Sequence, residues 1–167
     1  MIKKLERVVV AALKAVSVAA FTLLVVVVVW QVFARQVLSS ASPWSEEAAR
    51  YTFIVLIFLT ASLVFIERGH IAVEVFARWL PKRAQRVVAL GTEVIVFGFA
   101  VWVLVWGGWL IAQNAWHQQM SALPFSVGHV YAVMPVAGVL IAFACLVHVV
   151  DLVRGGPIWV ISDDEAI

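Results

Sequence analysis

The chain has 167 residues, of which 64% are hydrophobic and only 13% are charged, with a formal net charge of +2. A water-soluble domain of this length cannot bury so much apolar surface, so the composition predicts an integral membrane protein. The positive charge does not indicate a nucleic-acid-binding protein, because the basic residues flank the apolar segments. The single cysteine, Cys145, excludes an internal disulfide and a metal site built from several cysteines.

Four apolar segments are long enough, with their flanking turns, to cross the roughly 30 Å hydrocarbon core of a bilayer as helices. The predicted spans cover residues 12–36, 46–67, 86–113 and 125–152. The first resembles a secretory signal peptide, but its apolar run is longer than a signal requires and three more spans follow. Pro135 predicts a kink within the fourth span. The sequence therefore predicts an all-α integral membrane protein with four transmembrane helices, in which residues 1–167 form one domain.

A polar turn at residues 42–50 precedes the apolar part of the second span. Ser42 or Ser45 can cap the start of that helix, and Pro43 suits its first turn. Trp44 lies near the end of the span, where an amphipathic ring favours the headgroup layer. The segment is thus expected to begin a well-capped helix at the membrane surface.

Charged residues gather on the same side of the membrane. Arg35 ends the first span, while Glu46, Glu47 and Arg50 begin the second after a short loop. Both carboxylates complement the positive helix N-terminus, and Arg50 lies one turn later, within reach of either. We expect these four residues to form one network. The adjacent carboxylates also leave open a cation site at the aqueous edge.

The connection after the second span has a periodic polar pattern. His70, Glu74 and Arg78 recur every fourth residue, and apolar residues occupy the remaining positions between 71 and 80. This pattern predicts a short interfacial amphipathic helix over about residues 70–80, lying in the plane of the membrane surface. A strand also fits the alternation at its start, but an open sheet edge is not viable against lipid. The basic residues that follow suit anionic lipid headgroups; they are Lys82, Arg83 and Arg86.

The third span has an aromatic stripe. Trp102, Trp106 and Trp109 are spaced i, i+4 and i+7, which places them on one face of a helix. Two interpretations stay open at this stage. The rings provide bulk against lipid or neighbouring helices, or they form a flat contact surface for a partner protein.

Two ionisable residues lie near the inner ends of their spans. The separation in sequence between Lys14 and Arg35 equals the separation between Glu93 and Asn114. At 1.5 Å per residue, Lys14 and Glu93 each lie about 31 Å from the outer end of their own span. This matched depth predicts a structural ion pair between Lys14 and Glu93, with a transport role for Glu93 as the alternative.

Four histidines raise a haem hypothesis. His70 and His148 are expected near the inner side of the membrane, and His117 and His129 near the outer side. This is the ligand count of a two-haem, four-helix cytochrome, but His70 and His117 fall in connections rather than within spans. The sequence therefore favours a protein that is not an enzyme and has no cofactor or metal, and a haem-binding cytochrome subunit is kept as an alternative.

The distribution of Lys and Arg predicts the orientation of the chain. One side of the membrane carries ten of these residues and the other only two, Arg35 and Arg50. The ten residues are Lys3, Lys4, Arg7, Lys14, Arg68, Arg78, Lys82, Arg83, Arg86 and Arg154. Both termini are therefore expected on the cytoplasmic side of a multi-pass membrane protein.

Four ordered motifs follow one another along the chain. They are Val32-Phe33-Ala34-Arg35, Pro43-Trp44-Ser45-Glu46-Glu47 with Arg50, Arg68 with His70-Ile71, and Tyr131 with Pro135. Together with the four spans, they make most of the chain resemble the DctQ-type small subunit of tripartite ATP-independent periplasmic (TRAP) transporters. The Pro-Trp-Ser-Glu-Glu block is the most specific of the four. Where that family often has Gly in the second half of span two, this chain has Thr60-Ala61, which puts the close packing there in question.

The resemblance implies sodium-driven uptake of a carboxylate-bearing solute across a bacterial inner membrane. It implies a large membrane subunit that carries the solute and sodium sites and moves like an elevator, with the small subunit as its scaffold. The expected partners are this large subunit, the periplasmic solute-binding protein and membrane lipids, and no nucleic acid. A self-contained small transporter is the second alternative, although the spans lack a cationic residue at mid-depth for an anionic solute. The residues given structural or partner-interface roles are Arg35, Trp44, Glu46, Glu47, Arg50, Arg68, His70, Glu74, Arg78, Trp102, Trp106 and Trp109.

Overall fold

The computed structural model describes residues 2–40, 42–67 and 80–154. Within these ranges, four helical segments are long and apolar enough to span a membrane: Arg7–Gln36, Pro43–Ile66, Ala84–Asn114 and Val127–Val153. The described residues contain no strand, although an isolated bridge joins Gln119 to Ser126. The all-α class and the four predicted spans are therefore confirmed.

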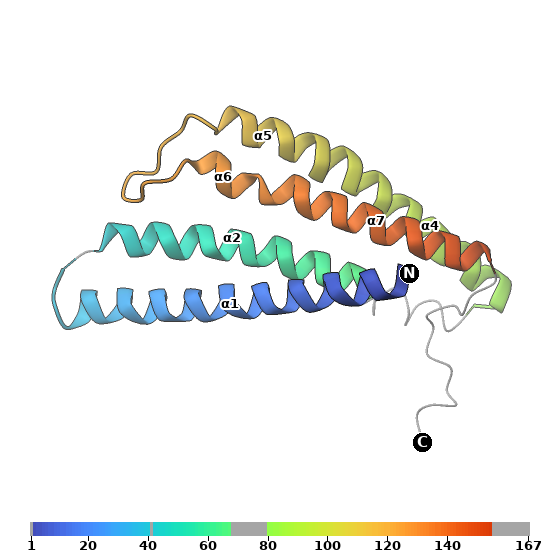
Figure 1. Ribbon diagram of the computed structural model, residues 1–167, viewed down its shortest axis with the longest axis horizontal. Helices are drawn as coiled ribbons and strands as arrows, with labels where there is room; N and C mark the ends of the chain where they lie inside the picture. Colours follow the sequence, from blue (N-terminus) through green and yellow to red (C-terminus); the bar gives the residue numbers. More distant parts are fainter. Residues whose placement is uncertain (1, 41, 68–79, 155–167) are drawn as a thin grey trace, which may run out of the picture.

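The first two spans are continuous helices, and the last two are each built from several segments. The elements in chain order are α1 (Ile2–Gln36), α2 (Pro43–Ile66), α4 (Lys82–Phe99), η1 (Ala100–Gly107), α5 (Gly108–Asn114), α6 (Val127–Tyr131) and α7 (Val133–Val153). The third span comprises α4, η1 and α5, and the fourth comprises α6 and α7. We call the end of the molecule that holds the connections 37–42 and 115–126 the loop end, and the opposite end the terminal end (Figure 1).

The four spans form an open row rather than a closed bundle (Figure 1). Among the described helices, α1 contacts only α2, α2 packs on α7 and touches α6, and α7 packs on the third span. A row that is one helix thick leaves both of its faces uncovered by the chain itself. Between 11% and 33% of the most apolar 18-residue window of each span is buried. The bilayer or a partner must therefore cover most of the apolar surface.

Two small apolar clusters hold neighbouring helices together. One joins η1 to α7, and the other joins α1, α2 and α7. The first consists of Ala100, Leu104, Ile141 and Cys145, and the second of Leu13, Ile66 and Ala144. Both clusters include α7, which therefore lies inside the row rather than at its edge.

Close approach between the last two spans depends on glycine. A Cβ atom on Gly138 of α7 would lie 2.7 Å from the Cβ atom of Leu104 and 2.9 Å from the backbone nitrogen of Val105. A Cβ atom on Gly128 of α6 would lie 2.7 Å from the Cα atom of Trp116. Real Cβ atoms do not approach so closely, so glycine is what allows these backbones to meet, as at other contacts between membrane helices.

Both later spans depart from a regular α-helix. η1 is a π-helical segment, a rare form that occurs mostly as a short insertion in α-helices. The fourth span is interrupted at Ala132, between α6 and α7. The nitrogen of Pro135 cannot donate a hydrogen bond to the carbonyl of Tyr131, and its ring crowds that carbonyl. Pro135 therefore accounts for the interruption at Ala132, and the predicted kink stays a prediction; nothing in the residue pattern indicates the π-helix.

The predicted interfacial helix over residues 70–80 falls almost entirely outside the described residues. Arg68, His70, Glu74 and Arg78 also lie outside them. This helix therefore stays a prediction. The chain is described again from Leu80, and extended backbone at Pro81 precedes the start of α4.

Candidate functional site

An ion pair joins the first two helices at the loop end. Nη2 of Arg35, in the last turn of α1, lies 2.9 Å from Oε1 of Glu46, in the first turn of α2. The expected contact between these two helix ends is therefore present. Both side chains are largely exposed. An exposed ion pair of this kind adds no more than about 1 kcal/mol to the free energy of unfolding.

The neighbouring carboxylate binds a different part of the molecule. Oε1 of Glu47 accepts the backbone N–H of Ser121 at 2.8 Å, and Oε2 accepts that of Ala122 at 2.7 Å. These amides belong to the connection between the third and fourth spans. Hydrogen bonds to an ionised carboxylate are stronger than neutral ones. Glu47 thus fastens this connection to α2, a contact missed from the sequence because backbone donors leave no side-chain signature.

The connection that Glu47 holds is ordered by its own backbone hydrogen bonds. The N–H of Met120 donates to the carbonyl of Phe125 at 3.0 Å, and the N–H of Val127 donates to the carbonyl of Gln118 at 2.9 Å. These bonds close the chain into a short antiparallel turn, with the two amides bound by Glu47 near its tip. The carboxylate therefore contacts a structured loop, and the contact positions α2 relative to the ends of α5 and α6.

The structure corrects two expectations for the first turn of α2. Arg50 forms no ion pair among the described residues, because Glu46 turns toward α1 and Glu47 toward the loop. Ser42 occupies the N-cap position, but its side chain makes no cap hydrogen bond; instead the buried hydroxyl of Ser45 donates to the carbonyl of Ser42 at 2.8 Å. The partners of the two carboxylates also weigh against a cation site, since a cation would compete with both.

At the terminal end, α1 and α2 are joined by a second ion pair, between Lys14 and Glu67. This finding corrects the predicted pair between Lys14 and Glu93. Depth along a span does not determine which spans are neighbours, and α1 lies beside α2 without contacting α4 (Figure 1). Lys14 is therefore close to the end of α2 and is separated from Glu93 by the width of the row.

The two ion pairs bracket the hairpin formed by α1 and α2. The separation in sequence between Lys14 and Arg35 equals the separation between Glu46 and Glu67. At 1.5 Å per residue the two pairs are about 31 Å apart, which matches the roughly 30 Å thickness of a hydrocarbon core. Each charge therefore lies at a membrane edge with a partner, and the uncharged stretches lie between them.

A third polar contact is buried between α4 and α7. Nδ1 of His148 lies 3.1 Å from Oε1 of Glu93, and the two side chains are 3% and 1% exposed. Cys145 is buried one turn before His148 in α7. An isolated carboxylate is costly in hydrocarbon, so the contact with His148 helps Glu93 to be tolerated within a span. The sequence places Glu93 and His148 on the same membrane side but does not indicate that their spans pack together.

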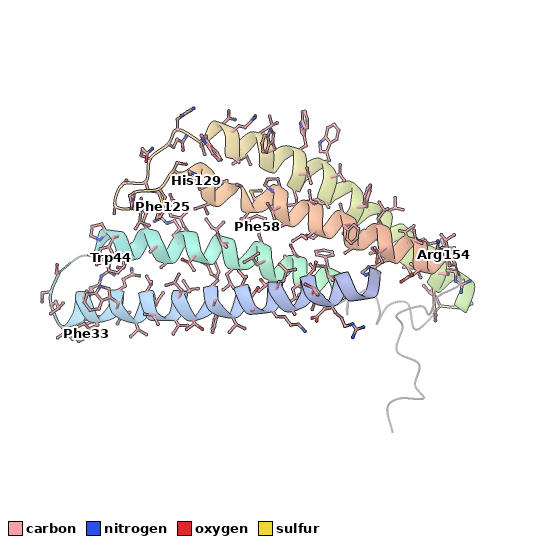
Figure 2. The ribbon with its side chains drawn as sticks, viewed as in Figure 1. Phe33, Trp44, Phe58, Phe125, His129 and Arg154 are labelled. Atoms are coloured by element: carbon pink, nitrogen blue, oxygen red, sulfur yellow. The ribbon has the colours of Figure 1, made fainter. Side chains whose placement is uncertain are left out.

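The tryptophan stripe of the third span faces away from the chain. Trp102, Trp106 and Trp109 are 75%, 61% and 54% exposed. They lie on η1 and α5, at the edge of the row, where lipid or a partner would contact them. Both interpretations of the stripe therefore stay open. Trp44 is also exposed and lies at the loop end of α2 (Figure 2).

Two of the three described histidines, His129 and His148, bind other groups of the chain. Nδ1 of His129 lies 2.6 Å from Oγ of Ser126, and its ring packs on that of Trp116 with centroids 4.7 Å apart. His129 and His148 lie at opposite ends of the same span, too far apart to hold one haem between them. His117 is exposed, and His70 lies outside the described residues. These contacts lend the haem hypothesis no support.

Comparison with known proteins identifies related sequences over most of the chain. The family model described as "Tripartite ATP-independent periplasmic transporters, DctQ component" matches residues 24–155. The sialic acid TRAP transporter small permease protein SiaQ of Vibrio cholerae is 27% identical over 131 residues, which are 78% of this chain and 75% of that protein. A putative TRAP transporter small permease protein of Haemophilus influenzae is 26% identical over 144 residues, 85% of this chain and 88% of that protein. The matched region contains the loop-end contacts and the buried pair of Glu93 and His148.

Proposed function

The chain belongs to the family of DctQ components of tripartite ATP-independent periplasmic transporters, and from this premise we propose that it braces the large membrane subunit during sodium-driven uptake of a carboxylate-bearing solute. It is a small permease subunit, a component of a transporter rather than a member of an enzyme class. One relative is named for a sialic acid transporter. A sialic acid carries a carboxylate, which is consistent with the solute class proposed here.

The observation that best supports a bracing role is that the buried ionisable groups of the described spans bind one another. Glu93 is hydrogen-bonded to His148, and no Lys or Arg lies within residues 15–34, 51–66, 94–112 or 125–150. An anionic solute at mid-depth requires cationic or strongly polar donors directed into a cavity. The solute site therefore belongs to another subunit, and this chain supports it.

The arrangement of the spans suits a brace. Ion pairs tie α1 to α2 at both membrane edges, and Glu47 ties α2 to the loop that joins α5 to α6. The buried pair of Glu93 and His148 ties α4 to α7. Every neighbouring pair of spans in the row thus has a polar contact or a close backbone approach, and the two open faces present apolar surface to the partner and to lipid.

We further propose the partners and the location. The partners are a large membrane subunit and a periplasmic solute-binding protein, assembled in a bacterial inner membrane. Both termini lie on the cytoplasmic side, because ten of the twelve Lys and Arg residues lie at the terminal end or in the connection beside it. The segment 70–80 is proposed to lie along that surface as an amphipathic arm that opposes tilting of the row.

Purification in a mild detergent tests the proposed assembly. The tagged chain, produced together with the large membrane subunit of its own transporter, should retain that subunit in a stable complex. An unrelated four-span protein carrying the same tag is the control and should retain none. Recovery of the chain without the large subunit, under conditions where both are folded and abundant, would contradict the bracing role.

A further inference from the structure

An apolar hollow of about 160 Å³ lies between α4 and α7. It is lined by Val94 and Phe97 of α4 and by Cys145, Leu146 and Val149 of α7. Val94 and Leu146 are 61% and 53% exposed, so the hollow opens onto one face of the row. A water molecule in this hollow would lose hydrogen bonds, because the lining side chains offer almost no hydrogen-bonding partners. An empty hollow would also leave its lining without dispersion contacts, so an apolar group must fill it.

The hollow lies directly beside the buried polar contact of the membrane interior. Val94, which lines the hollow, follows Glu93 in the chain. Val149, which also lines the hollow, follows His148, the hydrogen-bond partner of Glu93. Whatever fills the hollow therefore lies against one flank of this contact.

Positive charge lies at the terminal end of the same two helices. Arg86 lies about two helical turns before Val94 on α4, and Arg154 lies little more than one turn after Val149 at the end of α7. At 1.5 Å per residue, Arg86 lies about 12 Å from Val94 along α4, and Arg154 lies about 8 Å from Val149 along α7. Both arginines are therefore closer to the membrane surface than the hollow is. Figure 2 shows Arg154 at the terminal end of the molecule. Asp151 of α7 adds one negative charge nearby. The net charge of Arg86, Arg154 and Asp151 together is still positive.

Both arginines are available to a ligand. Each is exposed, and neither forms an ion pair with a carboxylate of the described residues. A guanidinium group binds phosphate oxygens in a bidentate geometry and is always charged. A bilayer leaflet provides such phosphates at the depth of the arginines and hydrocarbon chains at the depth of the hollow.

We propose that the hollow and these two arginines bind one anionic phospholipid. One acyl chain fills the hollow between Val94 and Leu146, and the phosphate lies between Arg86 and Arg154. The bound chain covers the flank of the contact between Glu93 and His148 and fills the gap between α4 and α7. This site requires only that the chain is in a membrane, so it does not depend on the proposed bracing role.

Native mass spectrometry of the full-length chain in a mild detergent tests the site. Phosphatidylglycerol and phosphatidylcholine with the same acyl chains are added in turn. We expect one phosphatidylglycerol to be retained several-fold more than phosphatidylcholine. The double variant Arg86→Gln/Arg154→Gln should abolish this preference, and Val149→Phe, which fills the hollow, should lower retention of both lipids several-fold. Val139→Phe is the matched control, because Val139 is exposed on the same helix and does not line the hollow, and it should behave as the native chain.

Equal retention of the two lipids by the native chain would overturn the proposal. Val149→Phe that leaves lipid retention unchanged while preventing co-purification of the large subunit would assign the hollow to that subunit and equally overturn it.

Discussion

At the scale of single residues, Glu46 and Glu47 are adjacent and chemically alike, but their partners differ in kind. Glu46 meets an exposed guanidinium that lies 11 residues away in the chain. Glu47 binds two backbone amides that lie 74 and 75 residues away. A contact between distant segments constrains more of the chain than one across a short loop does. Glu47 should therefore contribute more to the arrangement of the spans.

Comparing Glu46→Ala with Glu47→Ala tests this difference. We expect Glu47→Ala to lower the thermal melting temperature of the purified chain more than Glu46→Ala, because it leaves two amides without their carboxylate and frees the loop. Fluorescence-detected thermal unfolding in one detergent would measure both variants. Equal melting temperatures for the two variants would show that the loop contact adds nothing beyond the exposed ion pair.

The buried contact between Glu93 and His148 should behave differently from an exposed pair. Removing one partner leaves the other unpaired in a low-dielectric interior, at a cost of about 3–5 kcal/mol. Replacing both by leucine removes the unpaired group as well, so Glu93→Leu/His148→Leu should be more stable than either single variant. A double-mutant cycle of unfolding free energies checks this. Additive losses would mean that the two side chains do not depend on each other.

The sequence indicates the depth of a charged residue along its span but not its partner. Depth follows from counting residues, which gives Lys14 and Glu93 similar depths in their spans. Which helices are neighbours depends on how whole spans pack. The partner of Lys14 is therefore Glu67, and the partner of Glu93 is His148. The contact of Glu47 with two backbone amides has no signature in any side chain.

At the scale of elements, length and apolarity predict the four spans because a long apolar helix can cross hydrocarbon with all its backbone hydrogen bonds made internally. Pro135 likewise marked the interruption of the fourth span through its missing N–H group. The π-helical segment η1 could not be predicted in this way. Its wider turn lies where Leu104 and Val105 meet the backbone at Gly138, a contact that only the packed structure reveals.

Substitutions at two glycines test the packing of the last two spans. Gly138→Ala places a Cβ atom against Leu104 and the backbone of Val105, and overpacking of this kind costs about 1–3 kcal/mol. Gly98→Ala is the matched control, because no atom lies within 4 Å of the added group. Since alanine favours helix over glycine by up to about 1 kcal/mol, the control should be neutral or stabilising. Equal unfolding free energies for the two variants would contradict the close approach at Gly138.

The segment 70–80 is the element whose placement most needs measurement. Spin labels introduced at Val75 and Trp79 should report contact with lipid or protein, and a label at Glu74 should report water, because the pattern puts these residues on opposite faces of an interfacial helix. Accessibility to oxygen and to a water-soluble paramagnetic reagent distinguishes the two environments. Uniform exposure to water at all three positions would leave a solvated loop, and the proposed arm would be lost.

At the scale of the whole molecule, the open row leaves much apolar surface for lipid or a partner to cover. Each span contacts one or two others, and both faces of the row stay apolar and uncovered. The polar contacts at the membrane edges and inside the row fix the spans relative to one another. Such a layer can brace a moving subunit.

Solute uptake by reconstituted liposomes tests the central claim, that this chain supports transport without performing it. Sodium-driven uptake of a sialic acid or a dicarboxylate would be measured with this chain alone, with the large subunit and binding protein alone, and with all three. We predict uptake equal to that of empty liposomes for the chain alone, and the highest uptake for the complete set. Sodium-driven uptake by the chain alone, above empty liposomes, would contradict the bracing role and establish a self-contained transporter.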